Sequence, residues 1–130
     1  MKTAKQLGIT AAERRALPKI RDGLREGRYR HVKRPEMAEK KGTKPVFNMN
    51  TMCSTFDCGQ VGCIGGWVAF EMKMNVEESA NYVDEATGPI QSLFYPPDNI
   101  TDWDNITPKR AATAIDNFLN GNEPWKRRAA

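Results

Sequence analysis

The chain has 130 residues, of which 39% are apolar and 8% aromatic, and its formal net charge is +4. This length predicts one domain over residues 1–130 with a modest hydrophobic core. No apolar run approaches the roughly 18 residues of a membrane span, and the first residues lack the apolar centre of a signal peptide. We therefore expect a cytoplasmic protein with no membrane partner.

Charge is segregated along the chain. Residues 1–45 carry 14 lysines and arginines against 5 acidic residues, whereas residues 46–106 carry one lysine against 9 acidic residues. Residues 107–130 are basic again. Two interpretations follow: the basic segment folds against the acidic middle and neutralises it, or it forms a basic face that binds nucleic acid or an acidic partner protein.

The first long helix has clear local signals. Thr10 and Glu13 match a capping box, so a helix is expected to begin at Ala11 and to end at Gly27. Apolar residues recur at helical spacing within it. Pro18 conflicts with this pattern because proline removes a helical hydrogen bond and clashes with the preceding turn. We expect a kink there or two shorter helices.

Several segments lack periodicity. Residues 1–9 and 126–130 are expected to be flexible. Residues 30–45 are charged and without pattern, which predicts an exposed basic connection. Residues 46–52 favour one short extended piece for which the sequence shows no strong strand partner.

The middle of the chain contains the most apolar segment. Residues 61–74 are apolar on nearly every side, which predicts a buried helix. Gly65 and Gly66 each weaken it by about 1 kcal/mol, a cost that is tolerated where another backbone approaches closely. Asn75 with Glu78 marks the start of a further helix.

The C-terminal third predicts a short helical turn at residues 90–94 and a clear last helix. Between them lies an acidic loop, 98–106, with Trp103 as its one large anchor. Thr107 caps the last helix, which ends at Gly121. The whole predicts a mainly α protein, a small single domain of four to five helices around the buried Cys/Gly-containing helix, with little or no sheet.

The three cysteines and the one histidine are the candidates for chemistry. Cys53, Cys58 and Cys63 with His31 could form a Cys3His zinc site, although this spacing is at the edge of the usual range. A reactive Cys58 thiolate before a helix is a second reading. It would have only His31 as a base, and Asp57 would raise the pKa of its thiol. We favour buried residues that stabilise a tight turn, and so expect no catalytic residue, metal or cofactor.

The basic segment supplies the candidate binding residues. An aromatic ring among phosphate-binding charges suits nucleic acid, and a large aromatic side chain suits a protein interface. The predicted binding residues for a partner protein or nucleic acid are Arg21, Arg25, Arg28, Tyr29, Arg30, Lys33, Arg34 and Trp103.

The segment CGQVGCIGGW, at residues 58–67, resembles a C-G-T-x-x-C-[IR]-[AG]-G-[WH] signature of short phage and prophage-type bacterial proteins. The likeness extends to LFYP at 93–96, WDNITP at 103–108, AIDNFL at 114–119 and GNEPW at 121–125. Gln60 stands where the signature has threonine, which argues against a required hydroxyl there. The resemblance implies a small accessory protein from a phage-like context, and it brings no catalytic residues.

These observations favour a non-enzymatic protein that acts in the host cytoplasm by binding another macromolecule. A host-directed inhibitor, such as a counter-defence protein, or a regulator fits this expectation, with a host defence or regulatory complex as its partner. Two alternatives are a nucleic-acid-binding protein that uses the basic N-terminal region and a small cysteine-dependent or zinc-containing protein centred on Cys58 and Cys63.

Overall fold

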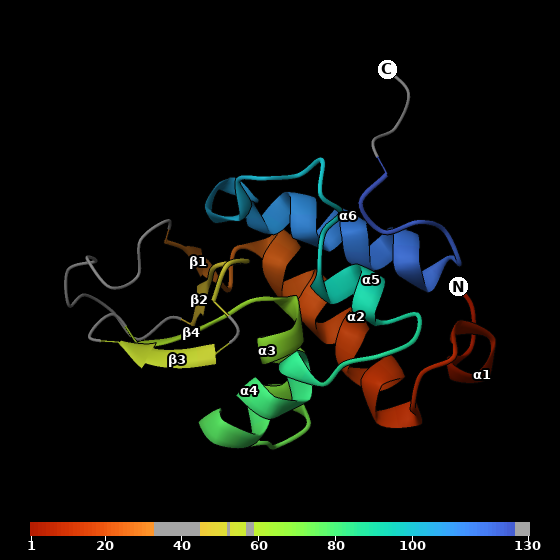
Figure 1. The fold of residues 1–130 in the computed structure, drawn as a ribbon, viewed down its shortest axis with the longest axis horizontal. Helices are drawn as coiled ribbons and strands as arrows, with labels where there is room; N and C mark the ends of the chain where they lie inside the picture. Colours follow the sequence, from red (N-terminus) through yellow and green to blue (C-terminus); the bar gives the residue numbers. More distant parts are fainter. Residues whose placement is uncertain (33–44, 52, 57–58, 127–130) are drawn as a thin grey trace.

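The computed structural model describes residues 1–32, 45–51, 53–56 and 59–126, and it confirms a mainly helical protein with little sheet (Figure 1). The α-helices among these residues are α1 (Ala4–Leu7), α2 (Ala11–Glu26), α3 (Ile64–Glu71), α4 (Val76–Asp84), α5 (Gln91–Phe94) and α6 (Pro108–Leu119). The strands are β1 (Arg30–His31), β2 (Val46–Phe47), β3 (Cys53–Phe56) and β4 (Gly59–Gly62). A 3₁₀ turn at Trp103–Asn105 precedes α6.

Helix α2 begins and ends where the sequence predicts. The Thr10 hydroxyl accepts from the backbone N–H of Glu13, and the Glu13 carboxylate accepts from the backbone N–H of Thr10. Gly27 ends the helix at φ 80°. Of the two alternatives at Pro18, a kink or two shorter helices, the second is wrong, because one continuous helix runs through it. Pro18 is only half-buried. The packing of α2 on its neighbouring helices offsets the hydrogen bond that proline cannot make.

The core lies between α2, α3 and α6. Helices α2 and α6 run side by side (Figure 1), and α2 also contacts α3. Each fully buried leucine or isoleucine contributes about 1.5–3 kcal/mol of hydrophobic stabilisation. The largest fully buried side chains on the three helices are Leu17, Ile20, Leu24, Ile64, Ile115 and Leu119.

A four-stranded sheet, in the order β1-β2-β4-β3, covers one end of the helices (Figure 1). Strands β1, β2 and β4 are parallel, and β3 pairs antiparallel with β4. The expectation that residues 46–52 lack a strand partner is wrong, because Val46 pairs with Arg30 on one side and Val61 on the other. Two-residue strands carry no readable alternation, which explains the error.

Two expectations about residues 30–45 and 61–74 need correction. Residues 30–31 are not an exposed connection but the half-buried strand β1, while residues 33–44 lie outside the described part of the chain. The buried helix is shorter than residues 61–74, because the chain is still in β4 up to Gly62. A Cβ on Gly65 would lie 2.9 Å from the Val83 side chain and 3.0 Å from that of Phe94. Side chains, not another backbone, therefore require this glycine.

The first nine residues, which were expected to be flexible, contain helix α1. Thr3 and Gln6 form a capping box around α1, and Leu7 is only 6% exposed. The backbone N–H of Lys2 donates to Leu119 O at 2.7 Å, which ties the segment to the end of α6. In the predicted flexible C-terminal end, Lys126 is exposed and residues 127–130 are not described. Within the described ranges, no helix is long and apolar enough to cross a bilayer.

Candidate functional site

Two of the predicted binding arginines form an internal clamp. Arg21 Nη1 lies 2.9 Å from Asp116 Oδ1, and Arg25 Nη2 lies 2.6 Å from Asp116 Oδ2. Arg21 Nε also pairs with Asp22 at 3.0 Å. Burial alone would raise the pKa of Asp116, but hydrogen bonds and charges from Arg25 and Arg21 outweigh it and lower that pKa. The clamp thus joins α2 to α6.

The clamp gives a prediction for stability. Asp116→Asn keeps the shape but removes the charge, and we expect it to lower the free energy of unfolding by about 1–2 kcal/mol at pH 7, given two partly exposed charge-assisted bonds. A lowered folded-state pKa contributes stability above the unfolded pKa of about 4, and this stability is lost as pH falls through the folded value. The difference between wild type and variant, measured by urea unfolding, should therefore shrink between about pH 5 and pH 2.

Asp22→Asn is the matched control for Asp116→Asn. Asp22 pairs with the same Arg21, but its partner lies next to it on the same helix and its side chain is 46% exposed. We expect a loss below about 0.5 kcal/mol. Equal losses for the two variants, or a gap that does not change with pH, would contradict the clamp.

The remaining predicted binding residues do not form one free face. Arg28 lies 3.5 Å from Glu26 and stays exposed. The Tyr29 ring packs edge-on against Trp67 at 5.0 Å, and burial raises the pKa of Tyr29 to about 12. Arg30 is half-buried in β1. The predicted stacking ring is therefore part of the packing, while Lys33 and Arg34 lie outside the described residues.

The acidic residues of segment 46–106 neutralise only part of the charge of the basic N-terminal segment. Lys19 pairs with Glu71 at 3.2 Å, as the folding of the basic segment against the middle predicts. The stronger clamp instead uses Asp116 in the last helix. Trp103 is half-buried, donates to Ile100 O at 2.9 Å and lies 6.5 Å from the Tyr95 ring. It anchors its own loop.

The cysteine region serves the fold where it is described. Cys63 is 2% exposed and caps α3, its Sγ accepting from the Gly66 N–H at 3.4 Å. His31 Nε2 lies 2.9 Å from Asp104 O. No three His, Cys, Asp or Glu side chains in the described part of the chain gather closely enough to hold a metal. Cys58 lies outside that part, and Cys53 is placed by its backbone alone, opposite Gly62.

A second acidic group has a structural partner that the sequence did not reveal. Tyr82 OH on α4 donates to Glu13 Oε2, while Glu13 Oε1 accepts from the Thr10 N–H. Burial first, and then the bond to Glu13, raise the pKa of Tyr82 above its ordinary value. Glu13 and Tyr82 border a hollow of about 300 Å³, which Glu85 also lines. Because both Glu13 oxygens and the Tyr82 proton are engaged, the pair links α2 to α4.

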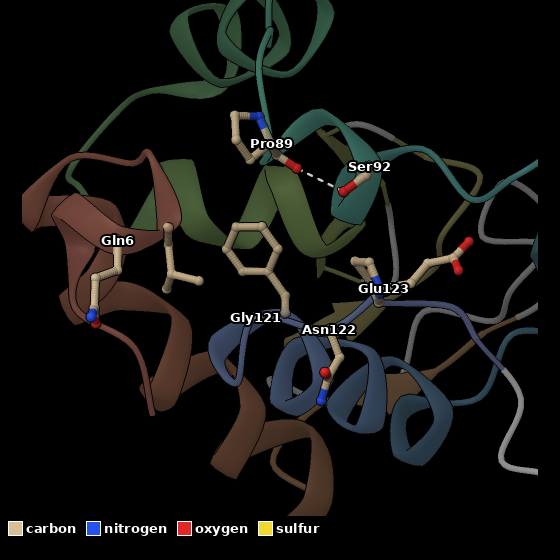
Figure 2. Close-up of a pocket in the computed structure, with 9 residues that line it drawn as sticks. Gln6, Pro89, Ser92, Gly121, Asn122 and Glu123 are labelled. Atoms are coloured by element: carbon tan, nitrogen blue, oxygen red, sulfur yellow. Dashed lines mark hydrogen bonds between the residues drawn. The ribbon is translucent and has the colours of Figure 1, made fainter.

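A cleft of about 370 Å³ lies between α1, the start of α5 and the segment after α6 (Figure 2). Gln6 and Glu123 lie at opposite ends of it, Pro89 and Ser92 lie along one side, and Gly121 and Asn122 along the other (Figure 2). The residues lining it are Gln6, Leu7, Pro89, Ser92, Phe118, Gly121, Asn122, Glu123 and Pro124.

The cleft combines buried apolar groups with polar groups that have bonding capacity left. Leu7 and Phe118 are 6% and 4% exposed and belong to the core. The Gln6 Oε1 accepts from the Thr3 N–H, which leaves its amide nitrogen available. The side chains of Asn122 and Glu123 make no hydrogen bond or ion pair with any residue in the described ranges.

Side-chain contacts hold the wall of the cleft that follows α6. Gly121 ends the helix at φ 78°, Asn117 Nδ2 donates to Pro124 O at 3.0 Å, and the Trp125 indole donates to Leu93 O at 3.1 Å. Trp125 is 7% exposed. This cleft was missed because α1 was expected to be flexible. The signal that could have found it is GNEPW at 121–125, where a large aromatic residue follows a turn.

Comparison of the chain with protein-family models, with curated proteins and with solved structures gives no match.

Proposed function

We propose that this chain is a small, non-enzymatic accessory protein of phage type that binds a partner protein through the cleft between α1, α5 and the segment after α6. The partner is a host protein of a defence or regulatory complex, met in the host cytoplasm. The phage context comes from the resemblance of residues 58–67. The binding role is carried by one observation, the composition of the cleft.

The cleft is suited to recognition. Among its nine lining residues only Glu123 has an ionisable side chain. General acid–base catalysis needs a proton donor and a proton acceptor near the reacting atoms, and this cleft supplies one such group. A buried apolar surface bordered by a few unengaged polar groups is instead the usual composition of a binding site.

Adjacent residues on α5 offer a matched test. Ser92 lines the cleft, whereas Gln91 is also exposed but does not line it. Ser92→Arg places a long charged side chain in the cleft, and Gln91→Arg adds the same charge beside it. In capture of host proteins by the tagged full chain, followed by mass spectrometry, we expect Ser92→Arg to lower recovery of the specific partner at least about tenfold, or about 1.4 kcal/mol. Gln91→Arg should leave recovery unchanged.

Both variants should unfold within about 1 kcal/mol of wild type, since Ser92→Arg loses one exposed hydrogen bond to Pro89 O. Equal recovery by the two variants would exclude the cleft as the binding site. Recovery that disappears after nuclease treatment and falls steeply with salt would favour the nucleic-acid alternative instead.

A further inference from the structure

A second hollow, of about 250 Å³, lies between α6 and the segment that follows this helix. Among the described residues, its lining includes Arg110 and Lys126 but no acidic side chain. It has only Pro124 in common with the cleft. The hollow is therefore a separate surface, and its charge is positive.

Arg110 is a half-buried arginine whose side chain has no hydrogen bond or ion pair with the residues that the structure describes. The other half-buried arginines in these ranges are engaged. Arg14 donates to a backbone carbonyl, Arg21 pairs with two carboxylates, and Arg30 also has an interaction partner. A guanidinium carries five N–H donors, so Arg110 keeps its full donor capacity for an external acceptor.

The surrounding elements hold the two cations at the same hollow. Arg110 lies in the first turn of α6, where its backbone N–H donates to the Thr107 hydroxyl at 3.2 Å. Lys126 follows Trp125, and the Trp125 indole donates to Leu93 O at 3.1 Å. Two like charges held close together repel each other, and an anion bound at the hollow offsets this repulsion.

The chemistry of the hollow favours carboxylates of a protein over phosphates of a nucleic acid. A guanidinium binds a carboxylate through two parallel N–H groups, and an ammonium acts as a point charge. Surfaces that bind single-stranded nucleic acid combine many cations with aromatic rings on which bases stack. In the described part of the chain, this hollow has two cations, and its one aromatic residue, Trp125, is only 7% exposed.

We propose that this hollow is a second docking surface, which binds an acidic segment of a protein through two neighbouring carboxylates. Arg110 binds one carboxylate with its guanidinium, and Lys126 attracts the other. Asn117, on the same wall, donates one N–H of its amide to Pro124 O at 3.0 Å and keeps the second N–H for the bound segment. This docking surface does not rest on the proposed function, because the cleft has a different lining.

Two defined peptides test the docking surface on the full chain. The probe is acetyl-Ala-Glu-Glu-Ala-amide, and its control has glutamine in place of both glutamates. In a titration at low salt followed by ¹⁵N NMR, the acidic peptide should shift the backbone amide signals of Thr113, Asn117 and Lys126. It should bind at least about fivefold more tightly than the control, which corresponds to about 1 kcal/mol. Added salt should reduce this difference, because it screens charges near the surface.

Arg110→Gln and Lys109→Gln form a matched pair of variants. Each removes one positive charge from the first turn of α6, but Lys109 is exposed and does not line the hollow. We expect Arg110→Gln to weaken binding of the acidic peptide at least about threefold, whereas Lys109→Gln should change it by less than about 1.5-fold. Neither side chain has a hydrogen bond or ion pair in the described ranges, so both variants should keep the unfolding midpoint of wild type.

Several outcomes would overturn the proposal. They are equal binding of the two peptides, equal losses for Arg110→Gln and Lys109→Gln, and shifts confined to other residues. Inorganic phosphate that binds at the same residues as tightly as the acidic peptide would identify a small anion as the occupant instead. A single-stranded thymidine oligonucleotide that binds there more tightly would identify nucleic acid. None of these measurements depends on capture of the cleft's partner, so the two proposals can fail separately.

Discussion

Replacing Trp67 with alanine is expected to lower the free energy of unfolding by about 3–5 kcal/mol, the range for large-to-small changes of buried aromatic residues. Trp67 is 7% exposed. Its ring packs edge-on against Tyr29 at 5.0 Å and against Phe70 at 5.1 Å. Its indole N–H donates to Val46 O at 3.0 Å. The Trp67 side chain thus joins α3 to strand β2 and to Tyr29, which follows α2.

The loss should be large because two costs add. Alanine leaves a cavity beside Tyr29, and it also removes the hydrogen bond from the indole to the carbonyl of Val46, a residue that is fully buried. Losing that hydrogen bond costs about 0.5–1.5 kcal/mol. A domain of this size has about 5–15 kcal/mol of stability in total, so denaturant unfolding should show a clear shift of the midpoint.

Trp67→Phe separates the two costs. Phenylalanine keeps an aromatic ring between Tyr29 and Phe70 but cannot donate to Val46 O. We expect it to fall between wild type and alanine, with a loss of about 1–3 kcal/mol. An alanine variant within about 1 kcal/mol of wild type would contradict this account of the packing.

The sequence predicted the helices whose ends have local chemical signals. Capping by Thr10, Asn75 and Thr107 appears in the structure as hydrogen bonds to the residue three positions later. Such bonds depend on neighbours in the chain, so their pattern is readable without a fold. For the same reason the positions of α2, α4 and α6 were predicted well.

The sequence did not predict features that depend on distant residues. Val46 forms a strand only because Arg30 and Val61 lie on either side of it. Arg21 and Asp116 are 95 positions apart, and the sequence offered the acidic middle or an external partner for the basic segment, not an acidic residue of the last helix. The ion pair follows from the packing of α2 on α6. The hydrophobic periodicity of a sequence does not indicate which charged side chains will pair.

The cleft was missed for a related reason. Gln6 and Leu7 come from the start of the chain and residues 121–124 from near its end, and both segments were assigned little structure. Residues 1–9 contain no long apolar pattern, yet Leu7 reaches the core once α6 is in place. The residues after α6 become a wall only because Trp125 finds a site beside α5. Short segments are ordered by docking and not by propensity.

Replacing Trp125 with alanine is therefore expected to remove the cleft while sparing most of the core. Trp125 is 7% exposed and donates to Leu93 O at 3.1 Å, so the change loses a buried aromatic group and a buried hydrogen bond. We expect a loss of about 3 kcal/mol, the low end of the usual range, because the segment after α6 can move and let water fill the site. Capture of the partner should fall at least about tenfold, since Glu123 and Pro124 lose their fixed position.

Two further variants distinguish docking from overall stability. Trp125→Phe keeps the apolar contact and should retain most of the partner binding, with a loss of about 1 kcal/mol for the missing hydrogen bond. Lys126→Ala changes the exposed neighbour and should alter neither property. In ¹⁵N NMR spectra of Trp125→Ala, shifts should concentrate at residues 121–126 and around Leu93. Unchanged signals there, or full partner capture, would show that the cleft does not depend on this anchor.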